Sequence, residues 1–512
     1  MQPSRAELPR LRTAHWPTGG YRREDLPERV LQFGTGMLLR AVCATAVDAA
    51  NRTGAFRGRI VAVQSTSHGW GRELNAQDGL FTLVERGLER GAPVERMRLV
   101  GSISRALVAD VDWPKVRDVV ARPELQVIVS NVTEAGFRLD GGFPERCTDL
   151  LYARFERLPD GPPVFVIPTE LVADNGDRLA AMVGELAARH ARGGEFLDWL
   201  HGHVRFCSSL VDRITTGMPP ADARAEIERR LGYHDALLTV TEPHCLWAVE
   251  ADPGALRAAL AIDAAPTVTF ASDIAFYSER KLRLLNGAHT ALAPLALLAG
   301  VPTVREAAEH PRLGPLLHRI LFEELVPGTD LPADAAEAFA KTVVERFRNP
   351  WLDHEWRVIA TNQTAKMSLR VVPSIVGFAA KWGRVPEGLA LACAAHLRFL
   401  RCVAEPSATE GQGWWRGATY PVNDVGLPAI SRHWQEAGPV LAAGPVPAGT
   451  LEHLATCALA DATLWGRDLT VLPGFREATT RWLVALERDG VDGALETLCG
   501  NSLGAAAGHA GP

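Results

Sequence analysis

Three polar side chains interrupt an otherwise apolar stretch near the middle of the chain. In KLRLLNGAHTALAP, residues 281–294, these are Lys281, Asn286 and His289. At about 100° of rotation per residue in an α-helix, the three side chains fall within an arc of roughly 140°. The spacing therefore predicts that they can share one pocket.

Together these residue types could move a proton beside a reacting oxygen. A poorly hydrated lysine amine can accept a proton from an alcohol. Asn286 offers an amide donor to a developing alkoxide, and His289 can orient or hydrogen-bond the same oxygen. Gly287 costs a helix about 1 kcal/mol relative to alanine, which suggests close approach of another backbone or a ligand. Taken singly, the three also fit a surface lysine, a capping asparagine and a core histidine.

Length and composition limit the class of protein that positions these residues. A chain of 512 residues predicts two domains, and 47% hydrophobic with 22% charged residues is typical of a soluble globular protein. The net charge of −6 offers no basic face, so we expect small-molecule partners rather than nucleic acid. The eight cysteines form no CxxC pair, which indicates reduced thiols in a cytoplasmic protein. No apolar run approaches the roughly 20 residues needed to span a membrane.

The N-terminal half alternates short β-branched runs with helix-like segments, which predicts an α/β domain with a Rossmann-like parallel sheet over residues 20–265. The expected strands are 29–33, 59–64, 125–131 and 164–168. A polar or glycine-containing turn follows each strand, and the four turns should meet at one crevice. Residues 266–505 read as a mainly α-helical domain that binds the substrate and carries the catalytic residues, with a long functional loop at 405–426.

The first of these turns resembles a nucleotide-binding loop. In FGTGMLLRA, residues 33–41, two glycines stand where a phosphate would meet the free N–H groups of a helix start. The third glycine of GxGxxG is absent, so a tight turn with a solvated Arg40 is the alternative; otherwise Arg40 could reach the pyrophosphate. In place of the usual acidic residue after the second strand the chain has Gln64, which leaves NAD and NADP both open. The candidate cofactor-binding residues are Phe33, Gly34, Thr35, Gly36, Arg40, Gln64, Thr133 and Glu134.

The motif KxRxLNGAH, preceded by a GxGxxxR loop, resembles the long-chain mannitol dehydrogenase family of polyol and uronate dehydrogenases. The likeness extends over about residues 27–480 and includes the segments 76–87, 130–137, 208–217 and 346–374. It implies that Lys281 is the catalytic acid/base, that Asn286 and His289 bind the reacting oxygen, and that no metal is needed. It also implies NAD as cofactor, with NADP not excluded.

Within that family, FGTGMLLRA and SNVTEAGF are most similar to the members that reduce tagaturonate to altronate. We therefore expect reversible reduction of a keto sugar acid. The alternatives are a polyol dehydrogenase for mannitol or arabinitol, a fructuronate reductase, and a non-catalytic NAD-sensing protein. The chain is expected to be a monomer or a small homo-oligomer.

A keto sugar acid would bring a carboxylate that needs a cation. Lys366 and Arg370, four residues apart, are the candidates, although an interface salt bridge or a solvated charge is the alternative for each. Asn175 is the residue that carries over from the family's asparagine segment to the oxyanion pocket, because Leu171 replaces its first asparagine. Asp212 and Arg213 are expected to tie the two domains together or to orient the lysine.

Overall fold

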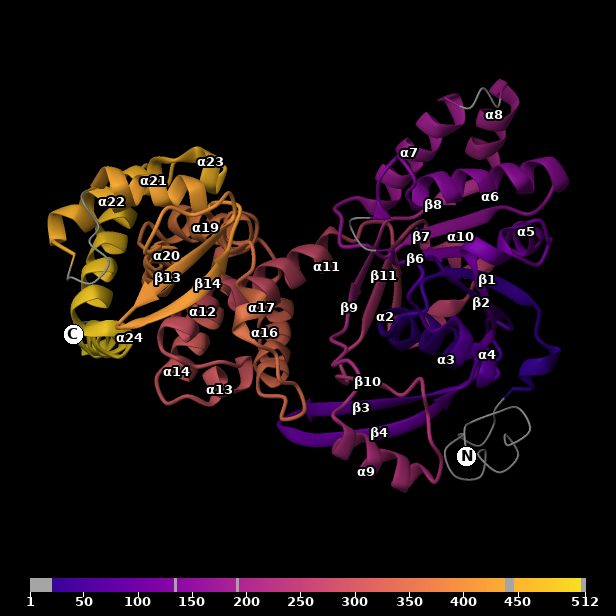
Figure 1. Ribbon diagram of the computed structural model, residues 1–512, viewed down its shortest axis with the longest axis horizontal. Coiled ribbons are helices and arrows are strands. Elements are labelled where there is room, and N and C mark those ends of the chain that lie inside the picture. Colours follow the sequence, from indigo (N-terminus) through magenta and orange to yellow (C-terminus); the bar gives the residue numbers. More distant parts are fainter. Residues whose placement is uncertain (1–20, 133–135, 190–192, 438–445, 508–512) are drawn as a thin grey trace. The chain divides into compact units, whose positions relative to one another are not determined.

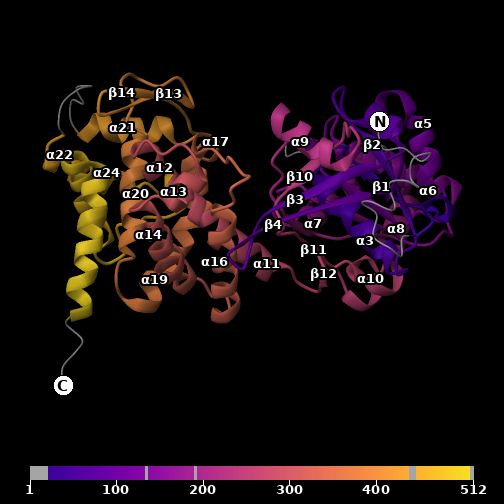
Figure 2. The same ribbon diagram turned by 90° about the horizontal axis from the view of Figure 1, so that it is seen from below.

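The computed structural model describes residues 21–132, 136–189, 193–437 and 446–507. The chain divides into two compact units, seen in two views in Figures 1 and 2. Unit 1 comprises Met1–Gly87 and Ala92–Tyr277, and unit 2 comprises Leu88–Gly91 and Ser278–Pro512. Unit 1 runs past the expected boundary at residue 265 because a further strand, β12 (Val268–Ala271), pairs with a strand of this unit.

A six-stranded parallel sheet forms the centre of unit 1 (Figure 1). Its strand order is β5-β2-β1-β6-β7-β8, and every neighbouring pair is parallel. The four predicted strands are present as β1, β2, β6 and β7, whereas β5 and β8 were not predicted. The bounds are β1 Glu28–Phe33, β2 Arg59–Gln64, β5 Ile103–Val108, β6 Val127–Ser130, β7 Val164–Pro168 and β8 Val204–Phe206.

Both faces of this sheet are covered by helices, which explains the continuous apolar runs of its strands. On β2, Ile60 and Ala62 pack into one core, whereas Val61 and Val63 pack into the other. The first core is closed by α2 Met37–Leu39, α3 Thr45–Arg52 and α10 Pro253–Ala259. The second is closed by α5 Ala109–Val120, α6 Phe143–Arg157, α7 Asn175–Arg189 and α8 Gly193–His203.

The order of the strands locates the ligand crevice of unit 1. Strands β1, β2 and β5 follow one another in one direction, and β6, β7 and β8 follow in the other. The reversal falls between β1 and β6, where ligands bind outside the carboxyl ends of the strands in open α/β sheets. Unit 1 also holds two three-stranded sheets: β10 Thr239–Thr241 with β3 Phe81–Glu89 and β4 Ala92–Val100, and β12 with β11 Leu246–Glu250 and β9 Ser209–Asp212.

Unit 2 is mainly helical, as predicted, and is built around two buried helices. In α12 (Gly287–Leu298) 11 of 12 residues are buried, and α12 packs against α20 (Glu387–Phe399). The long helix α24 (Phe475–Ala507) packs on α20. The longer surrounding helices are α16 Ala333–Phe347, α19 Val372–Trp382, α21 Leu427–Ala437 and α22 Ala448–Ala460, with shorter ones at α11 Ala275–Arg280, α13 Val304–Glu309, α14 Leu313–His318, α17 Trp356–Ile359, α18 Gln363–Lys366 and α23 Ala462–Trp465.

Three π-helical segments meet inside unit 2. They are η5 Lys281–Asn286, η6 Arg319–Leu325 and η7 Met367–Val371, and η5 packs against both of the others. A π turn is rare and is found frequently at functional sites. Two of these segments contain predicted site residues, which makes their meeting point the first place to look for a site in unit 2.

The long loop predicted at 405–426 is instead largely a β-hairpin. Strands β13 (Glu410–Trp415) and β14 (Ala418–Asn423) pair in antiparallel register. The two residues between them, Arg416 and Gly417, have φ values of 46° and 90°. Positive φ at both positions gives the tight turn whose twist matches a hairpin. The prediction was wrong because the glycines of this segment hid the aromatic and β-branched residues that favour strands.

Three chemical properties of the described residues bear on the predicted class. None of the helices in these ranges is both long and apolar enough to cross a bilayer. No three His, Cys, Asp or Glu side chains among them gather as a metal site would require. Every cysteine whose side chain is described is unpaired, and burial raises the pKa of the Cys43 and Cys393 thiols to about 12. These two thiols therefore stay protonated and unreactive near neutral pH.

Candidate functional site

The glycine loop between β1 and α2 has the geometry of a phosphate cradle. Gly34 has a φ of 127°, and a Cβ there would lie 2.9 Å from Leu39 Cδ1 and 3.3 Å from Asn131 O. Only glycine fits this position without a shift. At Gly36 a Cβ would meet no atom within 4 Å, so the side of the loop at Gly36 is open.

The carbonyl groups of this loop are held from inside the protein. Gln32 Nε2 donates to Gly34 O at 2.8 Å, and Arg40 Nη1 donates to Thr35 O at 2.6 Å. Helix α2 begins after Gly36 without a side chain capping its first N–H groups. Uncapped N–H groups at a helix start bind anions, so an open glycine loop followed by such a helix fits the pyrophosphate of a dinucleotide.

Two predicted cofactor contacts are corrected because their side chains lie in the protein interior. Phe33 is 0% exposed and packs against Trp113 and Phe143, with ring centroids 6.4 and 5.0 Å away. Arg40 is also 0% exposed and donates to Thr239 Oγ1 at 3.0 Å as well as to the loop. Burial lowers the pKa of the Arg40 guanidinium to about 10. Arg40 therefore braces the loop from behind instead of reaching a phosphate.

Gln64 closes the turn that follows β2. Its Oε1 accepts from Gly71 N at 3.0 Å, and its Nε2 donates to Thr66 O at 2.9 Å. Both polar atoms of the Gln64 amide are therefore already hydrogen-bonded. A ribose hydroxyl could bind Gln64 only by replacing one of these two bonds. The two other predicted residues of this edge, Thr133 and Glu134, lie outside the described residues.

Asn175 does not have an amide to spare for a substrate. Its Nδ2 donates to Glu170 O and to Ser209 O, both at 2.9 Å, and its Oδ1 accepts from Ser209 N at 2.9 Å. The side chain is 1% exposed. The predicted role in an oxyanion pocket is therefore corrected: Asn175 joins the backbone of unit 1 at the start of α7. Leu171, which replaces the family's first asparagine, is 60% exposed.

In unit 2 the lysine and the asparagine lie on a π-helical segment rather than on a regular α-helix. Lys281 opens η5 and Asn286 closes it, and His289 follows in the first turn of α12. A π turn bonds residues five apart, so Lys281 and Asn286 stand one π turn from each other. This brings the two closer to one face than the α-helical spacing assumed from the sequence. Lys281 and Asn286 are partly buried, and His289 is 7% exposed.

The glycine of the motif lies beside a neighbouring backbone, but at a distance that does not explain its cost to the helix. A Cβ on Gly287 would lie 3.5 Å from Arg370 O and 3.6 Å from Leu325 Cδ1. These are ordinary van der Waals distances, so the approach is close without requiring glycine. The contact brings the Lys281 segment against η7, which carries Arg370.

His289 is held as a neutral imidazole. Its Nδ1 lies 3.1 Å from Leu285 O, and because a carbonyl only accepts, Nδ1 carries the proton and Nε2 the lone pair. Burial is the main cause that holds the pKa of His289 well below its usual value. The further causes are the positive charges of three neighbours, His354, Arg346 and Arg370.

Lys366 and Arg370 belong to the same group of basic side chains as His289. Arg370 Nη1 donates to the hydroxyl of Thr290, the residue after His289, at 3.3 Å. The His354 ring centroid lies 5.3 Å from that of His289, and after burial the Lys366 charge is what lowers the pKa of His354. The structure thus brings Lys366, Arg370 and His289 together, as the substrate prediction requires.

The two cations of this group form no salt bridge with any acidic residue that the structure describes. Lys366 Nζ donates to Ile359 O at 2.7 Å, and Arg370 Nε is buried without a hydrogen-bond partner. Burial and then Arg370 lower the pKa of Lys366, the Asp424 carboxylate opposes them more weakly, and burial lowers the pKa of Arg370. Neither residue forms an ion pair within the part of the chain that the structure describes. The salt-bridge alternative considered for them is therefore not observed.

Two residues of these sites were not predicted from the sequence. Gln32 holds the glycine loop, and a polar residue within the apolar strand RVLQF was the signal that could have found it. Arg346 places a positive charge near His289, but nothing in the surrounding sequence, RFRNP, distinguishes it from other arginines of the chain. Charge that acts through space leaves no pattern in one sequence.

Unit 1 combines a parallel sheet with an open glycine loop, and unit 2 carries a lysine, an asparagine and a histidine on adjoining turns. These features together are typical of a two-domain dehydrogenase. The model of the mannitol dehydrogenase Rossmann domain matches residues 28–262, and that of the mannitol dehydrogenase C-terminal domain matches residues 273–413. The chain therefore belongs to the mannitol dehydrogenase family. The predicted family, and the predicted class of an oxidoreductase acting on CH–OH groups, are confirmed.

Named relatives narrow the comparison. The chain is 34% identical over 489 residues to the altronate oxidoreductase of Cronobacter sakazakii, covering 92% of this chain and 97% of the relative. It is 35% identical over 490 residues to that of Escherichia coli O7:K1, with the same coverage. The relatives thus span both units.

Two solved structures share the fold. The first is Pseudomonas fluorescens mannitol 2-dehydrogenase in a ternary complex with NAD and D-mannitol, with a TM-score of 0.71 at 25% identity, covering 98% of this chain and 99% of that one. The second is a D-sorbitol dehydrogenase in substrate-free form, with a TM-score of 0.76 at 20% identity, covering 97% and 100%. The second likeness concerns the fold alone.

Proposed function

We propose that this protein is an NAD-dependent oxidoreductase that reversibly reduces a keto sugar acid to its hydroxy form, of the tagaturonate-to-altronate type. The reaction takes a ketone, a hydride from NADH and a proton, and yields an alcohol and NAD⁺. NAD is bound by the Pseudomonas fluorescens relative, and the altronate oxidoreductases are more than a third identical to this chain over both units. These comparisons support the cofactor and the substrate class.

One observation carries the choice of an acid over a neutral sugar. Lys366 and Arg370 are partly desolvated cations next to the His289 and His354 rings. Neither forms a salt bridge among the described residues, although the buried Asp424 carboxylate acts on Lys366 from a distance. Unpaired cations in such a place are costly unless an anion joins them. A substrate carboxylate would supply that anion through charge-assisted hydrogen bonds.

Two residues of unit 2, Lys281 and Asn286, would handle the reacting oxygen, and His289 would hold a hydroxyl of the substrate. When bound, NADH supplies the hydride to the carbonyl carbon. Lys281 donates a proton to the oxygen as the ketone becomes an alcohol, and takes it back in the reverse direction. Asn286 donates its amide N–H to the same oxygen while negative charge develops there. The Nε2 lone pair of neutral His289 accepts a hydrogen bond from a substrate hydroxyl.

Steady-state assays with a panel of ketouronates and ketoses, each with NADH and with NADPH, test this function. We expect oxidation of NADH with a ketouronate such as tagaturonate, and much slower turnover of neutral ketoses. If folded protein oxidises neither cofactor with any member of the panel, the proposal is wrong. Binding of NADH without turnover would instead support the NAD-sensing alternative.

The same substrate panel distinguishes the alternative enzyme classes. Preference for fructose or xylulose over every ketouronate would indicate a polyol dehydrogenase for mannitol or arabinitol. Preference for fructuronate would still agree with a cation that binds the substrate carboxylate, but the enzyme would be a fructuronate reductase.

The predicted cytoplasmic location and the predicted state of assembly, a monomer or small homo-oligomer, stay predictions.

A further inference from the structure

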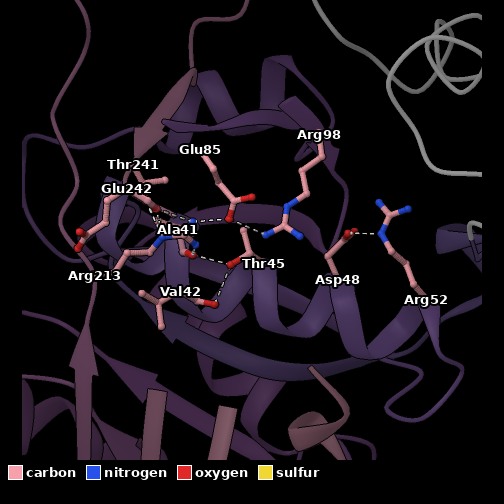
Figure 3. Close-up of polar contacts among 10 residues, drawn as sticks. All are labelled: Ala41, Val42, Thr45, Asp48, Arg52, Glu85, Arg98, Arg213, Thr241 and Glu242. Carbon is pink, nitrogen blue, oxygen red and sulfur yellow. Dashed lines mark hydrogen bonds and ion pairs between the residues drawn. The ribbon is translucent and has the colours of Figure 1, made fainter. Parts of the chain in front are cut away.

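A buried hydrogen-bond network in unit 1 has Arg213 at its centre (Figure 3). The side chain of Arg213 is 0% exposed. Its guanidinium donates to Thr241 Oγ1 at 2.5 Å and to Ala41 O at 2.7 Å. It also donates to Glu242 O at 3.1 Å and pairs with the Glu85 carboxylate at 2.5 Å. All of these partners belong to unit 1, so Arg213 holds this unit together and does not tie two domains as expected.

The contact with Ala41 falls on a π turn in the helix that follows the glycine loop. Ala41 belongs to η2 (Arg40–Ala44), which lies between α2 and α3. Its carbonyl accepts from two side chains, Thr45 Oγ1 at 2.5 Å and Arg213 Nη1. A π turn shifts the hydrogen-bond register of a helix, and side chains that enter the ladder fix where the shift occurs. Arg213 therefore holds this helix about one turn beyond the phosphate cradle.

A second buried arginine repeats this arrangement on the same strand. Arg40 Nε donates to Thr239 Oγ1 just as Arg213 Nε donates to Thr241 Oγ1, and each threonine hydroxyl donates a hydrogen bond to a backbone carbonyl. Thr239 and Thr241 are two residues apart on β10, so their side chains share one side of that strand. Because Arg40 also holds Thr35 O, the helix start is anchored to β10 at two points.

A contribution to folding stability does not by itself explain why this charged network is buried. Glu85 accepts from Arg98 at 3.3 Å as well as from Arg213, which makes an Arg–Glu–Arg group that is mostly buried. Removing such charges from water costs several kcal/mol per ion, and apolar replacements of buried ion pairs are often neutral or stabilising. Through Arg213 the group reaches Ala41 O, on the helix that begins at the phosphate cradle.

We propose that Arg213 is a positioning residue for the dinucleotide. By holding Ala41 O to β10 and Glu85, it sets the direction in which Gly36 and the first turn of α2 present their N–H groups to the pyrophosphate. Arg213 touches neither the cofactor nor the substrate in this role. The inference rests on the proposed binding of NAD, and it adds a residue 177 positions beyond Gly36 to the cofactor site.

Direct titration of NADH, followed by its fluorescence, tests the role without any substrate. For Arg213→Met we expect the Kd for NADH to rise about tenfold, because the helix behind the phosphate cradle loses the support that Arg213 gives at Ala41 O. At saturating NADH, kcat and the KM for the keto substrate should stay near those of the wild type. Arg213→Lys keeps a charge beside Glu85, but a compact ammonium with three N–H donors cannot span the four acceptors that the guanidinium joins. Its Kd should therefore remain raised although its Tm partly recovers.

Arg52→Met serves as the matched control. Arg52 lies on α3, pairs with Asp48 at 2.7 Å in a largely buried place and donates to Leu99 O at 3.1 Å, so these contacts join α3 to β4 and not to the glycine loop. We expect Arg52→Met to lower Tm and to leave the Kd for NADH unchanged. Should Arg213→Met fail to fold, Thr241→Val removes one acceptor of Arg213 with little change of shape, and a smaller rise of the Kd is expected.

Three outcomes would overturn the inference. The first is an unchanged Kd in Arg213→Met or Thr241→Val while wild-type protein binds NADH, which leaves the proposed function intact. The second is an equal rise in Arg52→Met at an equal loss of Tm. The third is recovery of both Kd and Tm in Arg213→Lys. Wild-type protein that binds neither NADH nor NADPH would remove the inference and the proposed function together.

Discussion

His289 Nδ1 lies 3.1 Å from the carbonyl oxygen of Leu285, one helical turn earlier. This contact fixes the tautomer of the histidine, because the carbonyl can only accept. The remaining ring nitrogen, Nε2, is an acceptor as long as the ring is neutral. Burial and the nearby positive charges keep it neutral by holding its pKa well below the usual value. The histidine thus offers a lone pair rather than a second proton donor.

The lowered pKa of His289 makes a prediction about stability. Below about pH 6.5 the unfolded chain takes up a proton that the folded chain refuses, so folding stability falls as the pH falls through this window. His289→Asn removes this contribution. Urea unfolding at pH 7.5 and at pH 5.5 should therefore show a smaller loss of stability on acidification in the variant. An equal loss in both proteins would mean that His289 titrates normally in the fold.

Replacement of Lys281 tests the proton donor. Lys281→Ala should lower kcat by about 10²- to 10⁴-fold, the usual contribution of a positioned general acid or base. The Kd for NADH should stay within about twofold, because the change is in unit 2 and the phosphate cradle is in unit 1. Lys341→Ala is the matched control, since Lys341 is an exposed lysine of α16.

Added methylamine sharpens the test of Lys281. A small amine can enter the space left by the side chain and restore part of the proton transfer, so kcat of Lys281→Ala should rise with amine concentration. Near-normal turnover of the variant in plain buffer would show that another group handles the proton. The control variant should respond to the amine no more than the wild type does.

The pair Lys366 and Arg370 tests the substrate class. Lys366→Met and Arg370→Met should each raise the KM for a ketouronate about 10- to 100-fold, since a hydrogen bond to a charged group contributes about 1.5 to 3 kcal/mol. The KM for a neutral ketose should change little. Lys381→Met, which removes an exposed lysine that pairs with Asp330, is the control. Equal effects on acid and neutral substrates would mean that the pair shapes the pocket without binding a carboxylate.

The layout of the nucleotide unit was readable from the sequence because buried parallel strands leave continuous apolar runs and their turns leave glycines. The predicted runs 59–64 and 164–168 coincide with β2 and β7. The hairpin of β13 and β14 was missed because glycine and polar residues at its edges hide its alternation. Unit 1 extends to Tyr277, past the predicted boundary at residue 265, because β12 pairs with β11, while the two family models end at 262 and begin at 273 on either side of that boundary.

For the site, the sequence supplied the residue types but not their surroundings. Lys281, Asn286 and His289 lie on adjoining turns as predicted, although the π turn that aligns the first two follows from packing against η6 and η7. Arg40 was read as a ligand of the phosphate because a single sequence does not reveal that Thr239, nearly two hundred residues later, receives its guanidinium. Burial and long-range partners decide whether a charged side chain faces a ligand or the core.

The two glycines of the phosphate cradle should respond differently to alanine. At Gly34 a Cβ would meet Leu39 Cδ1 at 2.9 Å, and the φ of 127° disfavours any side chain, so Gly34→Ala should lower Tm and NADH affinity together. At Gly36 a Cβ would point into open space, so Gly36→Ala should leave Tm nearly unchanged. Its methyl group would instead occupy the place of the phosphate and raise the Kd for NADH. Thermal unfolding with and without NADH measures both effects, and unchanged NADH affinity in Gly36→Ala would contradict the placement of the pyrophosphate at this loop.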